Sequence, residues 1–307
     1  MNKLFELEKK YYSGSVAKQD YISKMHGLHR NLWDYSSFIK GKNILSITIM
    51  AGQIILETKE GIKMICDPSD ERIVPVEIIN FGDYERKELE MMRNFIGLKS
   101  VILDIGSNIG WYSLNYSRLA KKGLIFAYEP VPKTFKYLKE NIELNGTKNI
   151  APFNFGLSDV NKTLTFYYDP GLSGSTSMRR LHEDRKKIKI KCKVKRLDDI
   201  KLRTKRIDFI KCDIEGAEIF AIKGGLKTID RHKPVLFLEM LRKWAKKFGY
   251  HPNDIIKIMN KIGYLCFFAR KTKLIPLKKI TDNTLATNFY FLHSKKHAKF
   301  IKELVKK

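Results

Sequence analysis

The sequence predicts an α/β fold built on an open, mostly parallel β-sheet and preceded by an N-terminal extension. From residue 100 onward, short apolar segments alternate with longer segments of helical periodicity, which is the pattern of parallel strands joined by crossover helices. A glycine-rich turn, DIGSNIG, directly follows the first of these apolar segments. With 307 residues, of which 43% are hydrophobic, the chain is long enough to bury a large core.

Residues 1–84 form the predicted extension. The first forty residues carry broken apolar stripes, which indicate irregular helices. Three short strands follow at residues 43–50, 53–58 and 62–66, separated by glycine-containing turns. A helix over residues 85–95 then opens the main domain.

The main domain is predicted to span residues 85–293 and to contain a seven-stranded sheet. Its last two strands are joined by a long connection without an obvious helix, which favours an antiparallel edge. A basic helix over residues 295–305 lies in the C-terminal segment 294–307. The strands are predicted at residues 101–103, 124–128, 150–155, 207–212, 235–239, 265–269 and 288–292, and the intervening helices at 111–120, 132–145 and 254–262.

A basic insertion at residues 169–206 interrupts the alternation of strands and helices. A short strand at residues 163–168 precedes it, and the glycine- and serine-rich stretch 169–178 predicts a mobile loop. Residues 187–196 then alternate between apolar and lysine side chains, which predicts a strand with one cationic face. The apolar side chains expected to face inward are Ile188, Ile190, Cys192 and Val194.

The chain is strongly basic, with 59 Lys and Arg against 33 Asp and Glu and a net charge of +26. Such a field favours anionic partners, among them nucleic acid, acidic membrane surfaces and anionic glycans. The alternative is a lysine-rich composition spread over solvated faces. The sequence contains neither a run of about 18 apolar residues nor a signal peptide. We therefore expect a cytoplasmic protein, with peripheral contact to the inner face of the membrane as a further expectation from the charge.

The turn from Asp104 to Gly110 is the most informative motif. It lies between a strand and a helix, where glycine lets a ligand approach the backbone and a helix N-terminus offers free N–H groups. The dinucleotide pattern GxGxxG would require glycine at Asn108 and Trp111, so this turn does not match it. It suits instead a nucleoside that carries an amino acid. We expect Gly106, Ser107, Asn108 and Gly110 to form the turn and Asp104 to meet the ammonium group.

The next two strands end in residues that suit the rest of such a ligand. Glu129 closes the second strand, about twenty residues on, where an acid is placed to hydrogen-bond ribose hydroxyls. The third strand ends at Gly156 and Asp159, where a polar side chain is expected to reach an adenine amino group.

Taken together, the motifs resemble the FkbM methyltransferase family. In order along the chain they are NFGDYE (80–85), LDIGSNIGWYSL, FAYEPVPKTFKYLKENIELN, GLSD, RLDD (196–199), IDFIKCDIEGAE (207–218) and a P-x-L-x-x-E ending at Glu239. The resemblance covers residues 80 to 240 and implies a Rossmann-like class I methyltransferase fold that binds S-adenosylmethionine, with Glu85 in the cofactor site. It implies O-methylation, often of sugars or of polyketide and lipid-linked products.

The acceptor side of the reaction is expected at the ends of the fourth and fifth strands. Lys211, Asp213 and Glu215 occupy alternate positions, so an extended strand would turn them toward one side. Asp213 is the candidate general base, Lys211 would tune its charge, and Glu239 would help to bind the acceptor. Alternatively, Asp213 and Glu215 cap the next helix. These two residues and Glu239 also form a candidate metal site, although carboxylates at strand ends need no metal.

The predicted reaction is S-adenosylmethionine-dependent O-methylation of a sugar hydroxyl in a surface glycan or in a lipid-linked or nucleotide-linked saccharide. The basic surface favours an anionic acceptor. A nucleic-acid methyltransferase, acting on an RNA 2′-hydroxyl or a base, is the alternative. Two features argue against it: the basic segment lacks aromatic side chains for base stacking, and DIEG replaces the Asn-Pro-Pro-aromatic turn typical of base amino methylation.

Overall fold

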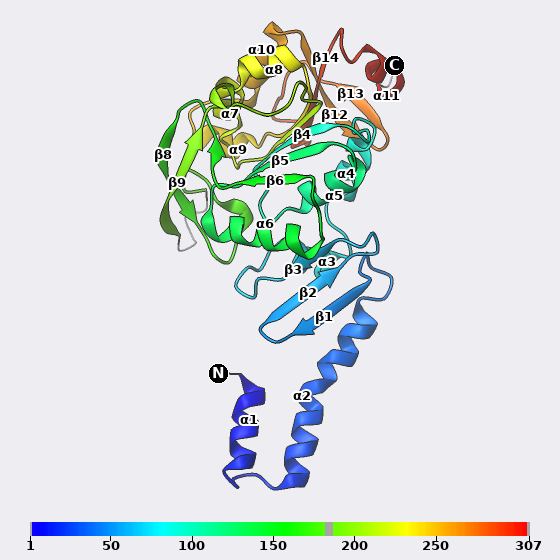
Figure 1. The fold of residues 1–307 in the computed structure, drawn as a ribbon, viewed down its shortest axis with the longest axis vertical. Helices are drawn as coiled ribbons and strands as arrows, with labels where there is room; N and C mark the ends of the chain where they lie inside the picture. Colours follow the sequence, from blue (N-terminus) through cyan, green and yellow to red (C-terminus); the bar gives the residue numbers. More distant parts are fainter. Residues whose placement is uncertain (1, 182–186, 306–307) are drawn as a thin grey trace.

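The computed structural model describes residues 2–181 and 187–305. Residues 182–186 of the predicted insertion and residues 306–307 of the predicted C-terminal segment lie outside this range. A rounded α/β body carries an N-terminal arm that projects from one end (Figure 1).

An eight-stranded sheet forms the centre of the body, in the order β13-β12-β14-β11-β10-β4-β5-β6. Strands β11, β10, β4, β5 and β6 are parallel to one another. Strand β14 is antiparallel to both of its neighbours, and β13 is antiparallel to β12. The strands are β4 (Val101–Ile105), β5 (Leu124–Tyr128), β6 (Ile150–Phe153), β10 (Phe209–Cys212), β11 (Val235–Glu239), β12 (Tyr264–Arg270), β13 (Lys273–Pro276) and β14 (Asn288–His293).

Helices cover both faces of this sheet because its strands are apolar on both sides. Neighbouring residues of β4 illustrate the arrangement, since Ile102 packs into one core cluster and Leu103 into the other. Helices α5 and α6 contribute to the first cluster, and α7 and α10 to the second. The helices of the body are α4 (Arg86–Met92), α5 (Trp111–Leu119), α6 (Pro132–Leu144), α7 (Glu218–Gly224), α8 (Leu226–His232), α9 (Arg242–Lys247), α10 (Pro252–Lys261) and α11 (Ala298–Leu304).

The predicted α/β class is confirmed, and two details of the sheet differ from the prediction. The sheet has eight strands instead of seven, because β13 forms a hairpin with β12. The antiparallel β14 lies between β11 and β12 and not at the edge. Its sequence explains this position: Phe289 and Phe291 enter one core cluster while Tyr290 and Leu292 enter the other. A strand that is apolar on both faces is best buried between two neighbours.

A second, three-stranded sheet in the order β7-β9-β8 stands beside the main one. It consists of β7 (Gly156–Leu157), β8 (Lys162–Tyr168) and β9 (Ile188–Lys195). The predicted alternation of β9 holds for Cys192 and Val194, which are buried against Phe166. It fails for Ile188, whose side chain is 51% exposed. This end of the strand extends past the small cluster that covers the rest of the inner face.

The N-terminal extension contains two helices, α1 (Lys3–Tyr12) and α2 (Lys18–Phe38), and a sheet in the order β1-β2-β3. Two asparagines of the α6 region fasten this sheet to the body: Asn145 Oδ1 accepts from the Lys63 amide and Asn141 Oδ1 from the Ile65 amide, both at 2.9 Å. The remaining elements are β1 (Ser46–Met50), β2 (Gln53–Glu57), β3 (Lys63–Ile65) and α3 (Val74–Phe81). Within the described residues, none of the helices has the length and apolarity that crossing a membrane would require.

Candidate active site

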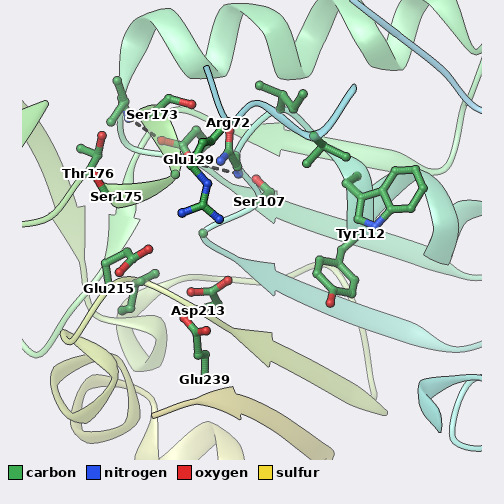
Figure 2. Close-up of a pocket in the computed structure, with 18 of the residues that line it drawn as sticks. Arg72, Ser107, Tyr112, Glu129, Ser173, Ser175, Thr176, Asp213, Glu215 and Glu239 are labelled. Atoms are coloured by element: carbon green, nitrogen blue, oxygen red, sulfur yellow. Dashed lines mark hydrogen bonds between the residues drawn. The ribbon is translucent and has the colours of Figure 1, made fainter. Parts of the chain in front are cut away.

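A pocket of about 350 Å³ opens at the carboxyl ends of β4, β5, β10 and β11. This is the edge of an α/β sheet at which ligands commonly bind. One wall is formed by the glycine turn after β4, and the opposite wall by residues that follow β10 and β11 (Figure 2).

The glycine turn leaves bare backbone at the floor of the pocket. Gly106 has φ +75°, and a Cβ at this position would collide with the carbonyl oxygen of Asp213. Gly110 has φ +99°, and its Cβ would lie 2.8 Å from the Leu138 side chain. Both positions therefore require glycine, as the sequence motif suggested. Asn108 also adopts a left-handed conformation, with φ +49°.

Glu129 holds this turn in place from the end of β5. One carboxylate oxygen accepts from the Asn108 amide at 3.0 Å and the other from the Val131 amide at 2.9 Å. Burial raises the pKa of Glu129 to about 7, against the lowering effect of these two hydrogen bonds. The carboxylate lines the pocket and retains lone pairs for a ligand.

Several polar atoms around the pocket have no partner. Buried polar groups are nearly always hydrogen-bonded, so a group of unpaired ones calls for an explanation. The atoms that line this pocket and are both shielded from solvent and unpaired are Ser107 Oγ, Asn108 Oδ1, Trp111 Nε1, Ser173 Oγ and Thr176 Oγ1. Their concentration on one pocket is the pattern expected for the binding site of a polar ligand.

Two of these unpaired hydroxyls come from the stretch that was predicted to be a mobile loop. In the structure, residues 173–176 line the pocket, and a short 3₁₀ turn (Ser173–Ser175) forms within them. The amide of Ser173 donates to Asp70 Oδ2 at 3.1 Å, which ties the loop to the N-terminal extension. Arg72 of the same extension reaches into the pocket (Figure 2), and its Nε donates to Glu77 at 2.9 Å. The sequence analysis did not predict that Arg72 or residues 173–176 line the pocket. The high density of hydroxyl side chains in GLSGSTS (171–177) was the one signal that could have indicated a polar binding loop.

Lys211 lies beneath the pocket between two carboxylates. Its ammonium group is 3.4 Å from Asp213 and 3.8 Å from Asp104, and it donates to the Gly106 carbonyl at 2.9 Å. Burial alone would lower the pKa of Lys211, but the two carboxylates outweigh it and raise that pKa. Lys211 therefore stays charged and balances both acids.

Asp213, Glu215 and Glu239 form an acidic cluster on the wall opposite the glycine turn. Each offers a carboxylate oxygen, and these oxygens all lie within 4.8 Å of one another. Figure 2 shows the three side chains directed toward a common point. Burial and the neighbouring Asp213 raise the pKa values of both Glu239 and Glu215. Such a cluster is able to share a proton or to coordinate a divalent cation.

Glu85 completes the ring of carboxylates around the pocket. It accepts a short hydrogen bond from the hydroxyl of Tyr112 and adopts a left-handed φ of +46°. Burial raises its pKa to about 7, although the Tyr112 hydrogen bond acts in the opposite direction.

The structure divides the predicted site residues into two groups. Those that line the pocket are Glu85, Gly106, Ser107, Asn108, Glu129, Lys211, Asp213, Glu215 and Glu239. Among the described residues, Asp104, Gly110, Gly156 and Asp159 are not part of this lining. Asp104 is fully buried beneath the turn, where it accepts from Ser113 Oγ at 2.5 Å. Its predicted contact with a ligand ammonium has no support from this position.

Comparison with known proteins identifies the family. A family profile described as the methyltransferase FkbM domain matches residues 104–266. The chain is 32% identical over 154 residues to methyltransferase sdnD of Sordaria araneosa, over 40% of this chain and 59% of that protein. It is 30% identical over 146 residues to the 2-O-methyltransferase NoeI of Sinorhizobium fredii, over 43% and 59% of the two chains.

A third relative is the hexuronic acid methyltransferase AglP of Haloferax volcanii, 26% identical over 163 residues, which cover 52% of this chain and 62% of that protein. The alignments with sdnD and NoeI each span 59% of the length of the relative. A solved structure of methyltransferase FkbM from Methylobacillus flagellatus aligns with a TM-score of 0.42 and 20% identity, over 64% of this chain and 44% of that one. Because the profile matches more than half of the sequence, the chain belongs to the FkbM family of S-adenosylmethionine-dependent methyltransferases.

Proposed function

We propose that this chain methylates a hydroxyl group of a saccharide and that Asp213 is the general base. The observation that carries the proposal is the position of Asp213. Its carboxylate lies on the pocket wall at the end of β10, beside the glycine turn and 3.4 Å from the buried ammonium group of Lys211. Two relatives, named a 2-O-methyltransferase and a hexuronic acid methyltransferase, support a hydroxyl-bearing sugar as the acceptor.

The residues of the pocket fit S-adenosylmethionine. The bare backbone of the glycine turn and the unpaired atoms of Ser107 and Asn108 offer contacts to its polar groups. We assign Glu129 to the ribose hydroxyls and Glu85, which lines the pocket in place of the buried Asp104, to the ammonium group. When bound, this cofactor supplies a methyl group on a positively charged sulfur.

The charge of the pocket supports the same cofactor. Five acidic residues line the pocket against three basic ones, although the chain as a whole carries +26. The acids are Glu85, Glu129, Asp213, Glu215 and Glu239, and the bases are Arg72, Lys211 and Lys243. A cationic ligand favours the ionised form of such carboxyl groups and is stabilised by them in turn.

In the proposed mechanism the acceptor hydroxyl hydrogen-bonds to Asp213, which removes its proton as the oxygen becomes the nucleophile. The fixed positive charge of Lys211 stabilises the carboxylate before this transfer and remains in place during it. Glu239 lies in the same cluster as Asp213 and lines the pocket, where it is placed to hydrogen-bond the acceptor and orient it. Most of the rate enhancement in such a reaction comes from alignment.

The exposed lysines of β9 extend this proposal to the wider surface of the acceptor. Lys189, Lys191 and Lys193 project from one face of the strand, and Lys187 at its beginning donates to the Ser175 carbonyl at the pocket rim at 3.3 Å. We propose that this cationic face attracts an anionic saccharide or the acidic membrane surface that carries it.

Two measurements test the proposed function. Calorimetry should show binding of S-adenosylmethionine and of its demethylated product, and no binding of NAD. Transfer of a labelled methyl group should then be assayed on nucleotide-linked and lipid-linked saccharides and on bulk RNA and DNA. Methylation of nucleic acid in the absence of saccharide methylation would overturn the assignment of the acceptor. Loss of activity in EDTA with recovery in Mg²⁺ would assign the acidic cluster to a metal instead of to a base.

A further inference from the structure

The N-terminal arm, formed by α1 and α2, is built differently from the rest of the protein. The two helices form an antiparallel hairpin that projects away from the body (Figure 1). Along these two fully described helices, no residue is buried. Most of the stability of a helix in a protein comes from packing of an apolar face, and this hairpin provides little of it internally.

Helix α2 nevertheless carries a regular apolar seam. Its members recur at alternating spacings of four and three residues, which is the heptad spacing of helices that pack along their length. They are Tyr21, Met25, Leu28, Leu32, Tyr35 and, just after the helix, Ile39.

Within the described residues, both ends of this seam have partners, and Met25 and Leu28 next to the first end are half-buried. At the beginning, the ring of Tyr21 stacks on Tyr11 of α1, with 4.4 Å between the ring centroids. At the other end, Ile39 packs against the core of the body. Helix α1 has 10 residues and α2 has 21, so α1, about 15 Å long, covers only half of the roughly 30 Å of α2.

The stretch of the seam between Leu28 and Ile39 is therefore open. Leu32 and Tyr35 are 51% and 50% exposed, and the adjoining Trp33 and Phe38 are 60% and 51% exposed. We call these four side chains the open seam. Four large apolar side chains within two helical turns form the kind of exposed patch that marks an interaction site.

The charge of the arm indicates which partner fits. Helix α2 has three basic and two acidic side chains, and α1 also has three and two. The arm is thus nearly neutral in a chain of net charge +26. Helices that bind anionic membranes, and segments that bind nucleic acid, concentrate Lys and Arg. Two nearly neutral arms, in contrast, approach each other without the repulsion that their basic bodies would produce.

Helix α2 is also weak as an isolated helix. Its N-cap residue, Ala17, makes no side-chain hydrogen bond to the first turn, and Gly27 lies in its middle. Both features lower the helix-forming tendency of the segment, which increases the need for a packing partner. A heptad seam is self-complementary, so the simplest partner is the same helix in a two-fold arrangement.

We propose that the open seam packs against α2 of a second copy of this chain, so that the protein is a homodimer joined through its N-terminal arms. This inference does not depend on the proposed function, because the arm shares no residue with the pocket.

Sedimentation velocity on the full chain, with the double variant Leu32→Lys/Tyr35→Lys, tests the proposal. At micromolar concentration the wild type should sediment as a single species with twice the 35.8 kDa mass of one chain. Charges within the seam should raise the dissociation constant at least about 100-fold, because a buried interface tolerates neither unpaired lysines nor the loss of apolar contact. The matched control is Ser23→Lys/Ser37→Lys, which adds the same charge to exposed positions of α2 outside the seam and should leave the dimer intact.

Hydrogen exchange of the α2 amides provides a second measurement if the double variant loses helix. In the wild type and the control, protection should rise with protein concentration, and in the double variant it should not. Binding of S-adenosylmethionine should be equal in all three proteins, which shows that the body is folded. A wild type that stays monomeric at tens of micromolar would overturn the proposal. So would equal dissociation of both variants, or recruitment of a monomeric wild type by phosphatidylcholine–phosphatidylglycerol vesicles.

Discussion

The two walls of the pocket use the same residue type in different ways. On the wall formed by the glycine turn, which we call the cofactor wall, Glu129 directly follows β5, and both of its carboxylate oxygens accept backbone N–H groups. On the opposite wall, which we call the acceptor wall after the proposed function, Asp213 follows β10 and faces Lys211, Glu215 and Glu239. The difference shows that an acid at the end of a parallel strand has no fixed role. An acid whose oxygens are held by the backbone shapes the site, whereas an acid that faces other titratable groups is available for proton transfer.

The largest expected effect is on the acceptor wall. Asp213→Asn keeps the shape of the side chain but removes the proton acceptor, so kcat should fall by about 10²–10⁴-fold. The dissociation constant for S-adenosylmethionine should hardly change. Initial-rate assays with saturating acceptor measure kcat, and calorimetry measures the dissociation constant.

The matched control is Asp230→Asn, because the Asp230 side chain is 54% exposed and lies on α8, outside the pocket. It should leave both quantities unchanged. If Asp213→Asn weakened cofactor binding while kcat was preserved, the division between the two walls would be wrong, and Asp213 would have a structural role.

The next effect concerns the pH dependence of stability. The pKa of Glu129 is near 4.5 in an unfolded chain and about 7 in the cofactor-free folded protein. The folded state therefore binds the proton more tightly, and the free energy of unfolding should fall as the pH rises from about 4.5 to 7 and level off above that range. The contribution of Glu129 is at most about 3 kcal/mol.

Chemical denaturation of the cofactor-free protein at a series of pH values measures this slope. Glu129→Gln, which cannot ionise, should make it shallower. An unchanged slope in this variant would show that other buried acids, such as Glu85, dominate the titration.

A smaller effect is expected when the cofactor wall loses its acid altogether. Glu129→Ala should weaken S-adenosylmethionine binding by about 1–3 kcal/mol, the range for leaving polar groups of a ligand unpaired. The value of kcat at saturating cofactor should fall less than in Asp213→Asn. Equal losses of kcat in the two variants would mean that the walls do not act separately.

The glycine turn of the cofactor wall is the part of the site that local sequence predicts most directly. Of the predicted cofactor residues, however, Asp104, Gly110, Gly156 and Asp159 lie outside the pocket lining. The predicted acceptor-side residues Lys211, Asp213, Glu215 and Glu239 all line it. Residues 101–119 form a strand, a glycine turn and a helix in one continuous segment. Within it, Gly106 and Gly110 are each required by a positive φ and a close neighbouring atom. Signals of this kind are contained in one segment. The expected contact between Asp104 and the ligand ammonium has no support, because the Asp104 side chain is fully buried outside the pocket lining. There it lies beside Lys211, its partner on the neighbouring strand β10.

Features that depend on distant segments were not accessible from the sequence. Arg72 and the loop residues 173–176 reach the pocket from outside the strand–helix units, through contacts such as that between Asp70 and the Ser173 amide. Likewise, β13 has only four residues and no strong pattern of its own, and its pairing with β12 reveals it. Tertiary contacts determine both features.

The smallest expected effect lies outside both walls, on the cationic face of β9. Replacing Lys189, Lys191 and Lys193 with glutamine should raise the acceptor KM by roughly tenfold or less and should flatten its dependence on salt, because long-range attraction is screened over about 8 Å at physiological ionic strength. Cofactor affinity should stay constant, since these side chains are exposed and lie outside the pocket lining.

The matched control replaces Lys121, Lys122 and Lys148, three exposed lysines at the opposite end of the parallel strands, with glutamine. It makes the same change in net charge, so an equal rise in KM would assign the effect to the overall charge of the protein and not to β9. If the β9 variant matched the wild type at low salt, where attraction is least screened, the lysines would be a solvated face without a part in acceptor capture. A rise in KM confined to the β9 variant would place the outer part of the acceptor along this strand, and would add a third surface to the two walls of the pocket.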